Sequence, residues 1–283
     1  MKFGSRTLDL SSPKIMGILN ITPDSFSDGG RFVSASAAVE RVDLDGCLRA
    51  AQRMQRDGAH LIDIGGESTR PGAAQVGSQQ ELDRVLPVLE KLVSELDLVL
   101  SVDTSNPKLM SEAAKLGAGL INDVRSLTRE GALEAAVQAN LPVCLMHMQG
   151  DPQTMQDKPC YQSVVDDVSD YFRDRIERCV EGGVLKERII LDPGIGFGKS
   201  LEHNRALLLA TERFLAMGMP VLVGVSRKSM IGRILDRDDP NDRLAGSLAL
   251  AFDQFHRGAS ILRVHDVRET ADMLGVFQFL QQG

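Results

Sequence analysis

Charged and amide side chains recur at the ends of short apolar runs in this sequence. The run HLID ends in IGGESTRPG, the run LVLSVD in TSNP and the run RIILD in PGIGFGK. Burying a carboxylate or an ammonium group is costly unless the group is paired or hydrogen-bonded. These side chains therefore need partners, and a bound ligand can be one. The polar residues at the run ends are Asn20, Asp63, Asp103, Asn122, Asp123, His147, Asp192, Ser226, Arg227, Lys228, Arg263, His265 and Asp266.

Four of these residues form a set that suits a flat heterocycle. Asp103 and Asp192 offer acceptors, and Asn122 offers both a donor and an acceptor. Lys228 adds a cation. Two carboxylates can accept hydrogen bonds from the N–H groups of an amidine-like edge, while the amide and the ammonium group meet a carbonyl and ring nitrogens. We therefore expect a ring-binding site at these positions.

A second set suits a phosphate or a diphosphate. Arg70 and Arg263 carry guanidinium groups, whose planar fork matches phosphate oxygens. Asn20 and His265 add an amide and an imidazole. An arginine near the end of the eighth apolar run also agrees with the phosphate position that recurs in (β/α)8 barrels.

Each candidate also has a purely structural interpretation. Asp103 could cap the helix that follows it, and Asp192, which precedes a proline, could form a turn. Asn122 and its neighbour could satisfy loop backbone, and Lys228 could be solvated. For Asp63 we favour a structural role, as a core-edge residue bonded to a neighbouring strand.

The glycine-rich segment DPGIGFGK resembles a phosphate cradle, but the GxxxxGK[ST] pattern of a phosphate-binding loop is absent. Its three glycines allow close approach of the backbone. They also leave Phe197 free to lie against something flat. His147 sits between two methionines, and we expect it to be a packing residue.

The apolar runs indicate parallel strands that are buried on both faces, because their interiors are Ile, Leu and Val. Helix-like segments alternate with them, and eight such units in about 250 residues fit a (β/α)8 TIM barrel with its active site at the carboxyl ends of the strands. A doubly wound open sheet is the alternative, although no GxGxxG follows the first strand. The eight runs span 14–20, 60–66, 98–103, 119–124, 142–148, 188–194, 220–226 and 260–266.

The segments between the runs have apolar residues at helical spacing, and several end in a glycine, which is a common helix stop. The expected helices span 35–57, 80–96, 107–116, 130–139, 164–181, 202–217, 242–256 and 267–280.

In MGILNITPDSFSDGG, the first apolar run is followed by a polar segment that is longer than a turn requires. In a barrel it would lie on the active-site face, where a glycine-rich loop is a candidate lid carrying Phe26. An inert surface excursion is the alternative interpretation.

The composition bounds the remaining possibilities. The 283 residues are 43% hydrophobic and 25% charged, with a net charge of −7, which argues against nucleic acid or an anionic membrane as a general partner. The four cysteines contain no CxxC pair and fit reduced thiols in a cytoplasmic protein. Neither a signal peptide nor an apolar run long enough to span a bilayer is visible. We expect one domain over residues 1–283.

Long sequence blocks, in order, resemble the dihydropteroate synthase family. They are MGILNITPDSFSDGG, DIGGESTRPGA, SVDTSNP, INDVRSL, MHMQGDP, DPGIGFGK, GVSRKSMIG and RVHDV, and they extend from about Ile15 to Val267. The resemblance implies a transferase of folate biosynthesis that condenses 4-aminobenzoate with (7,8-dihydropterin-6-yl)methyl diphosphate. It also implies a homodimeric barrel, with diphosphate departing before the amine attacks.

The resemblance also assigns roles to residues of this chain. The pterin site would comprise Asp103, Asn122, Met146, Asp192, Phe197 and Lys228. The diphosphate site would comprise Asn20, Arg70, Arg263 and His265, with Mg²⁺ near Asn20 as the cofactor and Asp63 helping to organise that end. The 4-aminobenzoate site, at which sulfonamides would compete, would comprise Phe26, Thr69, Pro71, Phe197, Lys228 and Ser229. Two loops, 22–31 and 67–77, would close over it. The catalytic residues would be Arg70, Asp103, Asp192, Lys228, Arg263 and His265.

Two other functions compete with this one. A pterin-binding methyltransferase domain would share the barrel, but it would not need the diphosphate set or the pairing of TPDSFSDGG with SRKSM. A catalytically dead pterin-binding regulator would be expected to lose Arg70, Lys228 or Arg263, and all three are present.

Overall fold

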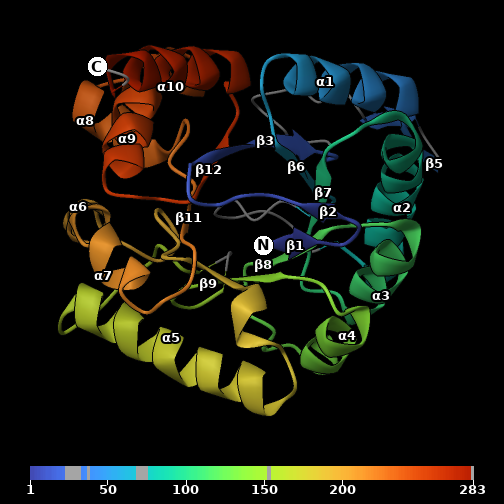
Figure 1. Ribbon diagram of the computed structural model, residues 1–283, viewed down its shortest axis with the longest axis horizontal. Helices are drawn as coiled ribbons and strands as arrows, with labels where there is room; N and C mark the ends of the chain where they lie inside the picture. The colour runs from blue at the N-terminus through green and yellow to red at the C-terminus, as the bar shows by residue number, and fades with distance from the viewer. Residues whose placement is uncertain (23–32, 37–38, 68–75, 152–153, 282–283) are drawn as a thin grey trace.

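The fold is seen in a computed structural model, which describes residues 1–283 except 23–32, 37–38, 68–75, 152–153 and 282–283. At its centre lies an eight-stranded parallel sheet, and helices surround it (Figure 1). The strand order is β10-β9-β8-β7-β6-β3-β12-β11, and a parallel bridge between Leu191 and Val221 joins the two outermost strands. The sheet is therefore a (β/α)8 barrel, as the sequence predicts.

The eight barrel strands coincide with the eight apolar runs. Their interiors are almost entirely buried, as expected for strands covered by helices on one face and by the barrel interior on the other. They are β3 (Lys14–Asn20), β6 (Leu61–Gly65), β7 (Val99–Asp103), β8 (Leu120–Asp123), β9 (Val143–Met146), β10 (Ile189–Asp192), β11 (Leu222–Val223) and β12 (Ile261–Val264).

The helices begin and end where local signals place them. In α3 the Asn106 side chain accepts a hydrogen bond from the Lys108 N–H at 3.1 Å, and Gly117 ends the helix in the left-handed conformation, with φ of 105°. The helices are α1 (Leu44–Arg56), α2 (Ser78–Glu95), α3 (Pro107–Leu116), α4 (Ala132–Ala139), α5 (Val164–Glu181), α6 (Leu201–Leu209), α7 (Thr211–Leu215), α8 (Ser229–Leu235), α9 (Leu244–His256) and α10 (Val267–Gln281), with short 3₁₀ turns at Lys186–Arg188 and Pro240–Arg243.

The helix expected over 35–57 is wrong in its first part. An antiparallel hairpin of β4 (Val33–Ser36) and β5 (Val39–Val42) precedes α1. Helix α1 starts at Leu44 because the Asp43 side chain accepts a hydrogen bond from the Gly46 N–H at 2.8 Å, which caps its first turn. The alanines of this segment favour a helix, and the two valines of VERV are three positions apart, so this stretch carries no strand alternation that would have indicated the hairpin.

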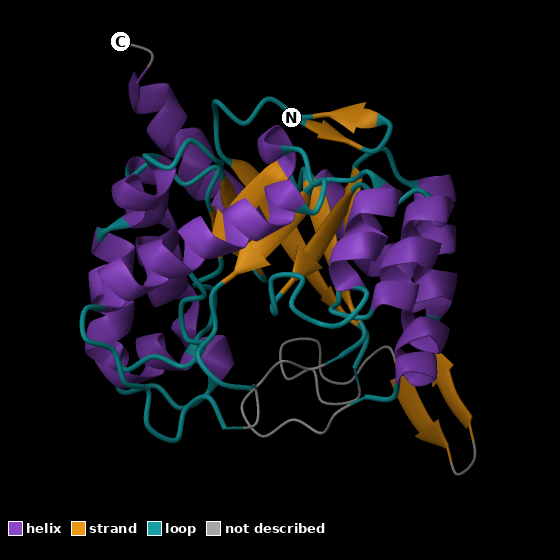
Figure 2. Ribbon diagram, turned by 90° about the horizontal axis from the view of Figure 1, so that it is seen from below, coloured by secondary structure: helices purple, strands orange, loops and turns teal. Residues whose placement is uncertain are grey.

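Three further elements differ from expectation. The helix expected over 202–217 is divided at Ala210 into α6 and α7, and α8 was not expected at all. A small hairpin of β1 (Lys2–Phe3) and β2 (Arg6–Thr7) was also missed. It lies at the amino end of the barrel, opposite the end toward which the strand arrows point (Figure 2).

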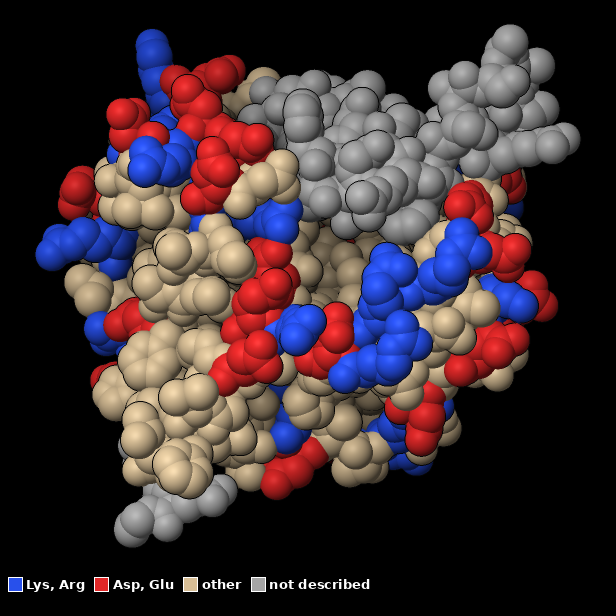
Figure 3. Space-filling model, turned by 90° about the horizontal axis from the view of Figure 1, so that it is seen from above, with Lys and Arg blue, Asp and Glu red and all other residues tan. Residues whose placement is uncertain are grey.

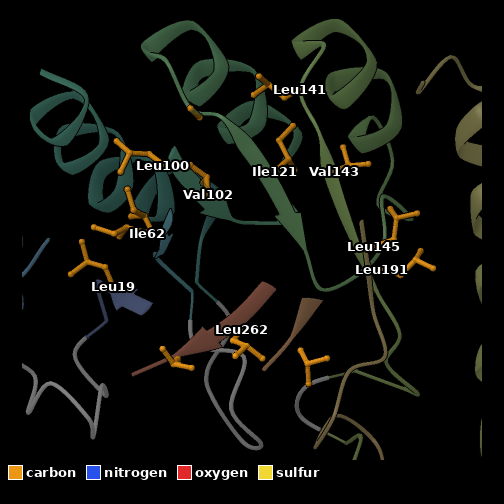
Figure 4. Packing of buried hydrophobic residues seen from close by; sticks show 14 of the residues in the cluster. Leu19, Ile62, Leu100, Val102, Ile121, Leu141, Val143, Leu145, Leu191 and Leu262 are labelled. Carbon is orange, nitrogen blue, oxygen red and sulfur yellow. The ribbon is translucent and has the colours of Figure 1, made fainter. Parts of the chain in front are cut away.

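The core has two layers, divided by the barrel wall. The outer layer, which includes Leu19, Ile62, Leu100 and Leu145, lies between the strands and the helices (Figure 4). The inner layer takes one residue from each barrel strand and Phe3 from the amino-terminal hairpin, and so fills the amino end of the barrel interior. Its members are Phe3, Met16, Leu61, Val99, Leu120, Cys144, Ile190, Leu222 and Ile261.

Candidate active site at the carboxyl ends of the strands

The alternation of side chains along each strand decides which residues enter the barrel interior. Successive strand residues point to opposite faces, so the residues two positions beyond the inner apolar layer also point inward. This second layer lies toward the carboxyl ends of the strands, where (β/α)8 barrels carry their active sites. Its members are Ile18, Asp63, Ser101, Asn122, Met146, Asp192, Gly224 and Arg263.

Asp63 is the centre of a hydrogen-bonded cluster that joins four strands. Its fully buried carboxylate accepts from Ser101 Oγ at 2.6 Å, from Asn122 Nδ2 at 2.9 Å and from Arg263 Nε at 2.7 Å. The same guanidinium donates from Nη2 to Asp103 at 3.1 Å. The expected bond of Asp63 to a neighbouring strand is confirmed. The cluster also fixes two predicted pterin residues and one predicted diphosphate residue in one place.

Asp103 retains its proton to unusually high pH. Burial, together with the nearby Asp63 carboxylate, raises the pKa of this carboxyl group from 3.8 to about 8 against the lowering effect of Arg263. A group whose pKa lies near the working pH can change its protonation state when a ligand donates to it.

Asp192 and Lys228 form the other half of the site. Asp192 Oδ1 accepts from the Gly194 N–H at 2.7 Å. Lys228 Nζ donates to the carbonyl of Ile195 and lies 4.6 Å from the centroid of the Phe197 ring, which is a cation–π contact. A ring that entered here would meet a carboxylate, an ammonium group and an aromatic face.

Burial shifts the pKa of both charged groups in this half. It raises the pKa of Asp192, which Lys228 opposes most strongly. It lowers the pKa of Lys228 to about 8, which Asp192 opposes and Arg263 reinforces. Each group therefore depends on the other for its charge.

Asn20 ends β3 beside Asp103. A Cβ added to Gly65, which lies between them in the sheet, would be 3.6 Å from Asn20 Oδ1 and 3.9 Å from Asp103 Oδ2. Among the described residues, no group of three or more His, Cys, Asp or Glu could hold a metal ion. A Mg²⁺ ion that takes most of its ligands from substrate phosphates and water needs few protein oxygens, and the Asn20 amide fits that pattern.

His265 is held against the end of the seventh strand. Its backbone N–H donates to Ser226 Oγ at 3.2 Å, and its ring Nδ1 lies 3.1 Å from the same oxygen. The adjacent Arg227 and Asp266 form an ion pair, with Nε to Oδ2 at 3.0 Å. These contacts join the loop after β11, which carries Lys228, to the loop after β12, which carries His265.

The glycines of DPGIGFGK serve close packing. A Cβ on Gly194 would lie 1.9 Å from the carbonyl oxygen of His147, and one on Gly198 would lie 2.6 Å from that of Gln149. The expected close backbone approach is confirmed, and the neighbour is the segment after β9. His147 is buried and packs edge-on against Tyr171 at 4.9 Å, as expected for a packing histidine.

The remaining predicted residues divide into two groups. Met146 is buried on the inner face of β9, and Ser229 is exposed at the first position of α8. Most of the two expected loops, 22–31 and 67–77, lies outside the described residues. So do four predicted site residues, namely Phe26, Thr69, Arg70 and Pro71.

Sequence reasoning missed a buried cation near the site, and it did not separate the roles of the adjacent Asn122 and Asp123. Lys199, at the end of the glycine string, is 2% exposed. A lysine directly after an apolar, glycine-rich segment was the available signal. Asp123, next to Asn122, points outward and accepts from the N–H groups of Arg125 and Leu127 at 2.8 Å each. The structural interpretation therefore holds for Asp123.

Fold and site together define a (β/α)8 barrel with a charged, hydrogen-bonded site at the carboxyl ends of its strands. A family model described as pterin binding enzyme matches residues 16–265. The dihydropteroate synthase of Escherichia coli strain K12 is 52% identical over 272 residues, which cover 96% of this chain and 93% of that protein.

Solved structures agree with this relationship. The Yersinia pestis dihydropteroate synthase in complex with a sulfonamide drug has a TM-score of 0.93 and 50% identity, covering 100% of this chain and 99% of that one. The Xanthomonas albilineans enzyme in complex with 7,8-dihydropteroate has a TM-score of 0.87 and 41% identity, with both chains covered fully. This chain belongs to the dihydropteroate synthase family of pterin-binding enzymes, which are transferases. Within its described part, no helix is long and apolar enough to cross a membrane.

Proposed function

We propose that this protein joins 4-aminobenzoate to (7,8-dihydropterin-6-yl)methyl diphosphate, giving 7,8-dihydropteroate and diphosphate as a step of folate synthesis. The family relationship supports the reaction. The observation that carries it to these residues is the cluster of Asp63, Asp103, Asn122 and Arg263 opposite Asp192 and Lys228, since it presents acceptors for a ring and cations for an anionic tail.

The pterin would lie between the two halves of the site. Asp192 and Asp103 would accept from its N–H groups, and Asn122 and Lys228 would meet its carbonyl and ring nitrogens. Asn122 is held by Asp63 at 2.9 Å, so its amide is oriented before a ligand arrives. Met146 and Phe197 would form the apolar walls, with Phe197 already in contact with Lys228.

The diphosphate would lie toward Asn20, Arg70, Arg263 and His265. Arg263 uses Nε and Nη2 on carboxylates, so a phosphate would be met by its remaining nitrogen or would compete with Asp103. His265 would add a donor, because Ser226 holds its ring in place. A Mg²⁺ ion held by Asn20 and the diphosphate oxygens would supply positive charge for the leaving group.

The 4-aminobenzoate would bind nearer the rim, where sulfonamides would compete with it. Ser229, at the exposed start of α8, and Phe197 and Lys228 lie on the described part of this site. Phe26, Thr69 and Pro71 would complete it. The loops 22–31 and 67–77 would close over the substrates and exclude water that could otherwise capture the reacting carbon.

The reaction would proceed by departure before attack. The bond between the pterin methylene and the diphosphate breaks, and its electron pair leaves with the diphosphate oxygen. The pterin ring shares the positive charge that develops, and the carboxyl groups of Asp192 and Asp103 stabilise it in their ionised forms. The amine lone pair then forms the C–N bond, and the amine proton passes to diphosphate or water. Because the amine is weakly basic and uncharged, it needs positioning more than a base.

A homodimer in the cytoplasm is the expected setting. Apolar side chains on α9 and α10 are exposed, namely Phe252 at 38%, Val276 at 65%, Phe279 at 75% and Leu280 at 67%. Figure 3 shows an uncharged area on this side, beside the carboxyl-terminal end of α10. An apolar patch of this kind is typical of a protein interface. Light scattering on the purified protein measures the assembly, and a monomer at micromolar concentration would contradict it.

Diphosphate release tests the proposed reaction directly. With the pterin diphosphate supplied, release should depend on 4-aminobenzoate, and the pterin product should carry it. Release that does not depend on the amine would contradict the synthase function. Pterin binding without turnover would favour the regulator instead.

Two variants separate the ring site from the loops. Asp192→Ala should abolish pterin binding, because it removes the carboxylate acceptor from the half of the site that Asp192 and Lys228 form. Phe26→Ala and Arg70→Ala should reduce turnover far more than pterin affinity. Calorimetry with the pterin and steady-state kinetics measure both, and equal losses in affinity and turnover would count against a closing role for the loops.

A further inference from the structure

Lys199 is a buried cation close to the proposed pterin site. Its ammonium group donates to the carbonyl of Phe197 at 2.8 Å and to that of His147 at 3.1 Å, and it lies 3.1 Å from His147 Nδ1. The residue is 2% exposed. A lysine buried to this degree is rare without a carboxylate partner, and its hydrogen-bond acceptors here are all uncharged.

The nearby negative charge is Asp192. Both residues meet at Gly194, whose N–H donates to Asp192 Oδ1 at 2.7 Å and whose added Cβ would lie 3.3 Å from Lys199 Nζ. Burial lowers the pKa of Lys199 to about 7 and Lys228 lowers it too, while Asp192 raises it, as expected for a neighbouring carboxylate, so the ammonium group is charged below about pH 7. Lys228 approaches the same carboxylate. Two ammonium groups therefore act on the one Asp192 carboxylate: Lys228 in the site and Lys199 behind it.

The same ammonium group also fixes an aromatic wall of the site. It holds the Phe197 carbonyl, and the Phe197 ring lies under Lys228 Nζ at 4.6 Å. Through the His147 carbonyl it ties this segment to the end of β9, next to Met146. One nitrogen thus sets the relative positions of Phe197 and of the segment after β9.

We propose that Lys199 is a positioning residue for pterin binding: its buried charge keeps the Asp192 carboxylate ionised, and its hydrogen bonds hold Phe197 against the ring. The inference rests on the proposed function, since it concerns the same pterin site. Lys199 acts from behind Asp192 and Phe197 and does not itself touch the ligand.

The charges around Asp192 give the direction of the effect. Burial raises the pKa of Asp192, while Lys228, the Gly194 N–H, Arg263 and Lys199 lower it, and the buried Cys144 thiol also faces this carboxylate. Loss of the Lys199 charge raises the pKa of Asp192 further. The pH below which protonated Asp192 weakens pterin binding then moves upward.

Three variants separate charge, hydrogen bonding and loop tethering. Lys199→Gln keeps a donor for the Phe197 carbonyl but loses the charge, and Lys199→Met loses both. Tyr161→Phe is the matched control, since Tyr161 Oη donates to the Gly198 carbonyl at 2.8 Å and so tethers the same segment without a charge. The probe is 6-hydroxymethylpterin, and its dissociation constant is measured by calorimetry from pH 5 to pH 8, with circular dichroism as the check on folding.

The charge-loss variants should bind the pterin at least about tenfold more weakly at low pH, with the acid limb of affinity moved upward by about one pH unit or more. Tyr161→Phe should keep the acid limb of the unaltered protein. If Lys199→Gln binds with an unchanged acid limb, the proposal is overturned, even where Lys199→Met loses stability. If the unaltered protein does not bind the pterin, the proposed function itself fails, which is a different result.

Discussion

The guanidinium of Arg263 lies 2.7 Å from the carboxylate of Asp63, although 200 positions separate the two residues in the chain. Arg263 belongs to β12 and Asp63 to β6, with β3 between them in the sheet. Their contact crosses the barrel interior at the level of the site. It connects the strand that carries the predicted phosphate-binding arginine to the strands that carry Asp103 and Asn122.

Removing one partner of this ion pair should lower the unfolding free energy far more than removing one partner of an exposed pair. Arg263→Met leaves a fully buried carboxylate without its guanidinium partner, which should cost about 3–5 kcal/mol of unfolding free energy. Adding Asp63→Asn should recover about 1–3 kcal/mol, because the uncompensated charge is gone. Urea denaturation of the single and double variants measures both values.

An exposed ion pair provides the control. Lys115 and Glu112 are also 2.7 Å apart but lie in solvent, so Lys115→Met should cost less than about 1 kcal/mol. A double variant no more stable than Arg263→Met would show that Asp63 does not depend on the arginine.

Asp103 should destabilise the fold as the pH rises. Its pKa of about 8 in the folded protein lies above the ordinary value of 3.8, so folding favours the protonated form. The stability contributed by this proton is fully present below about pH 4 and is lost as the pH rises through about 8. Asparagine has no proton to lose. Asp103→Asn should therefore gain stability relative to the unaltered protein between these pH values and keep a constant advantage above them.

Chemical denaturation at intervals from pH 4 to pH 9 measures the difference. A stability difference between Asp103→Asn and the unaltered protein that is independent of pH would contradict the shifted pKa. Turnover in the variant should fall most above about pH 8, where Asp103 of the unaltered protein is ionised, since the neutral amide cannot stabilise positive charge on the pterin.

Lys228 should set the alkaline limb of activity. Burial lowers its pKa to about 8, so its ammonium charge is present below that pH and lost above it. Lys228→Arg keeps a charge at all accessible pH values, so its alkaline limb in kcat/KM should move upward even if its maximum is lower. Lys228→Met should lose about a hundredfold or more in kcat/KM. An unchanged limb in the arginine variant would assign the titration to another group.

Gly194 should tolerate no side chain. Its φ of 66° disfavours other residues by about 1–2 kcal/mol, and an added Cβ would lie 1.9 Å from the His147 carbonyl oxygen. Gly194→Ala should therefore lose more than about 2 kcal/mol and displace Phe197, with weaker pterin binding. Gly218 is the control, because its φ of 84° is similar and nothing lies within 4 Å of an added Cβ. Equal costs in thermal unfolding would show that only the backbone conformation matters.

Much of the fold follows from local patterns. The eight apolar runs became the eight barrel strands, because short runs of Ile, Leu and Val between helical segments can be buried on both faces only in a parallel sheet. The hairpin over 33–42 was missed because its alanines have high helix propensity, while its pairing depends on two short segments meeting in register.

The candidate site was predicted in part. Asp103, Asn122 and Asp192 could be placed at the carboxyl ends of their strands, since the end of each apolar run marks them. Lys199 was missed, because only its place after an apolar, glycine-rich segment indicates it, and its burial comes from the segment after β9. Asp123 and Asn122 are adjacent on β8 and point to opposite faces of the strand. Asn122 therefore enters the site, whereas Asp123 binds backbone N–H groups outside it.

The sequence by itself determined which residue types stand at the strand ends and, through the two-residue period of a strand, which of them share a face. Only the tertiary structure decided their partners: that Asp63 binds Ser101, Asn122 and Arg263 at once, and that the charges of Lys199 and Lys228 both act on Asp192. The reason is physical. Side-chain direction is a property of the local backbone, whereas distances across the interior depend on how many strands close the barrel and with what stagger.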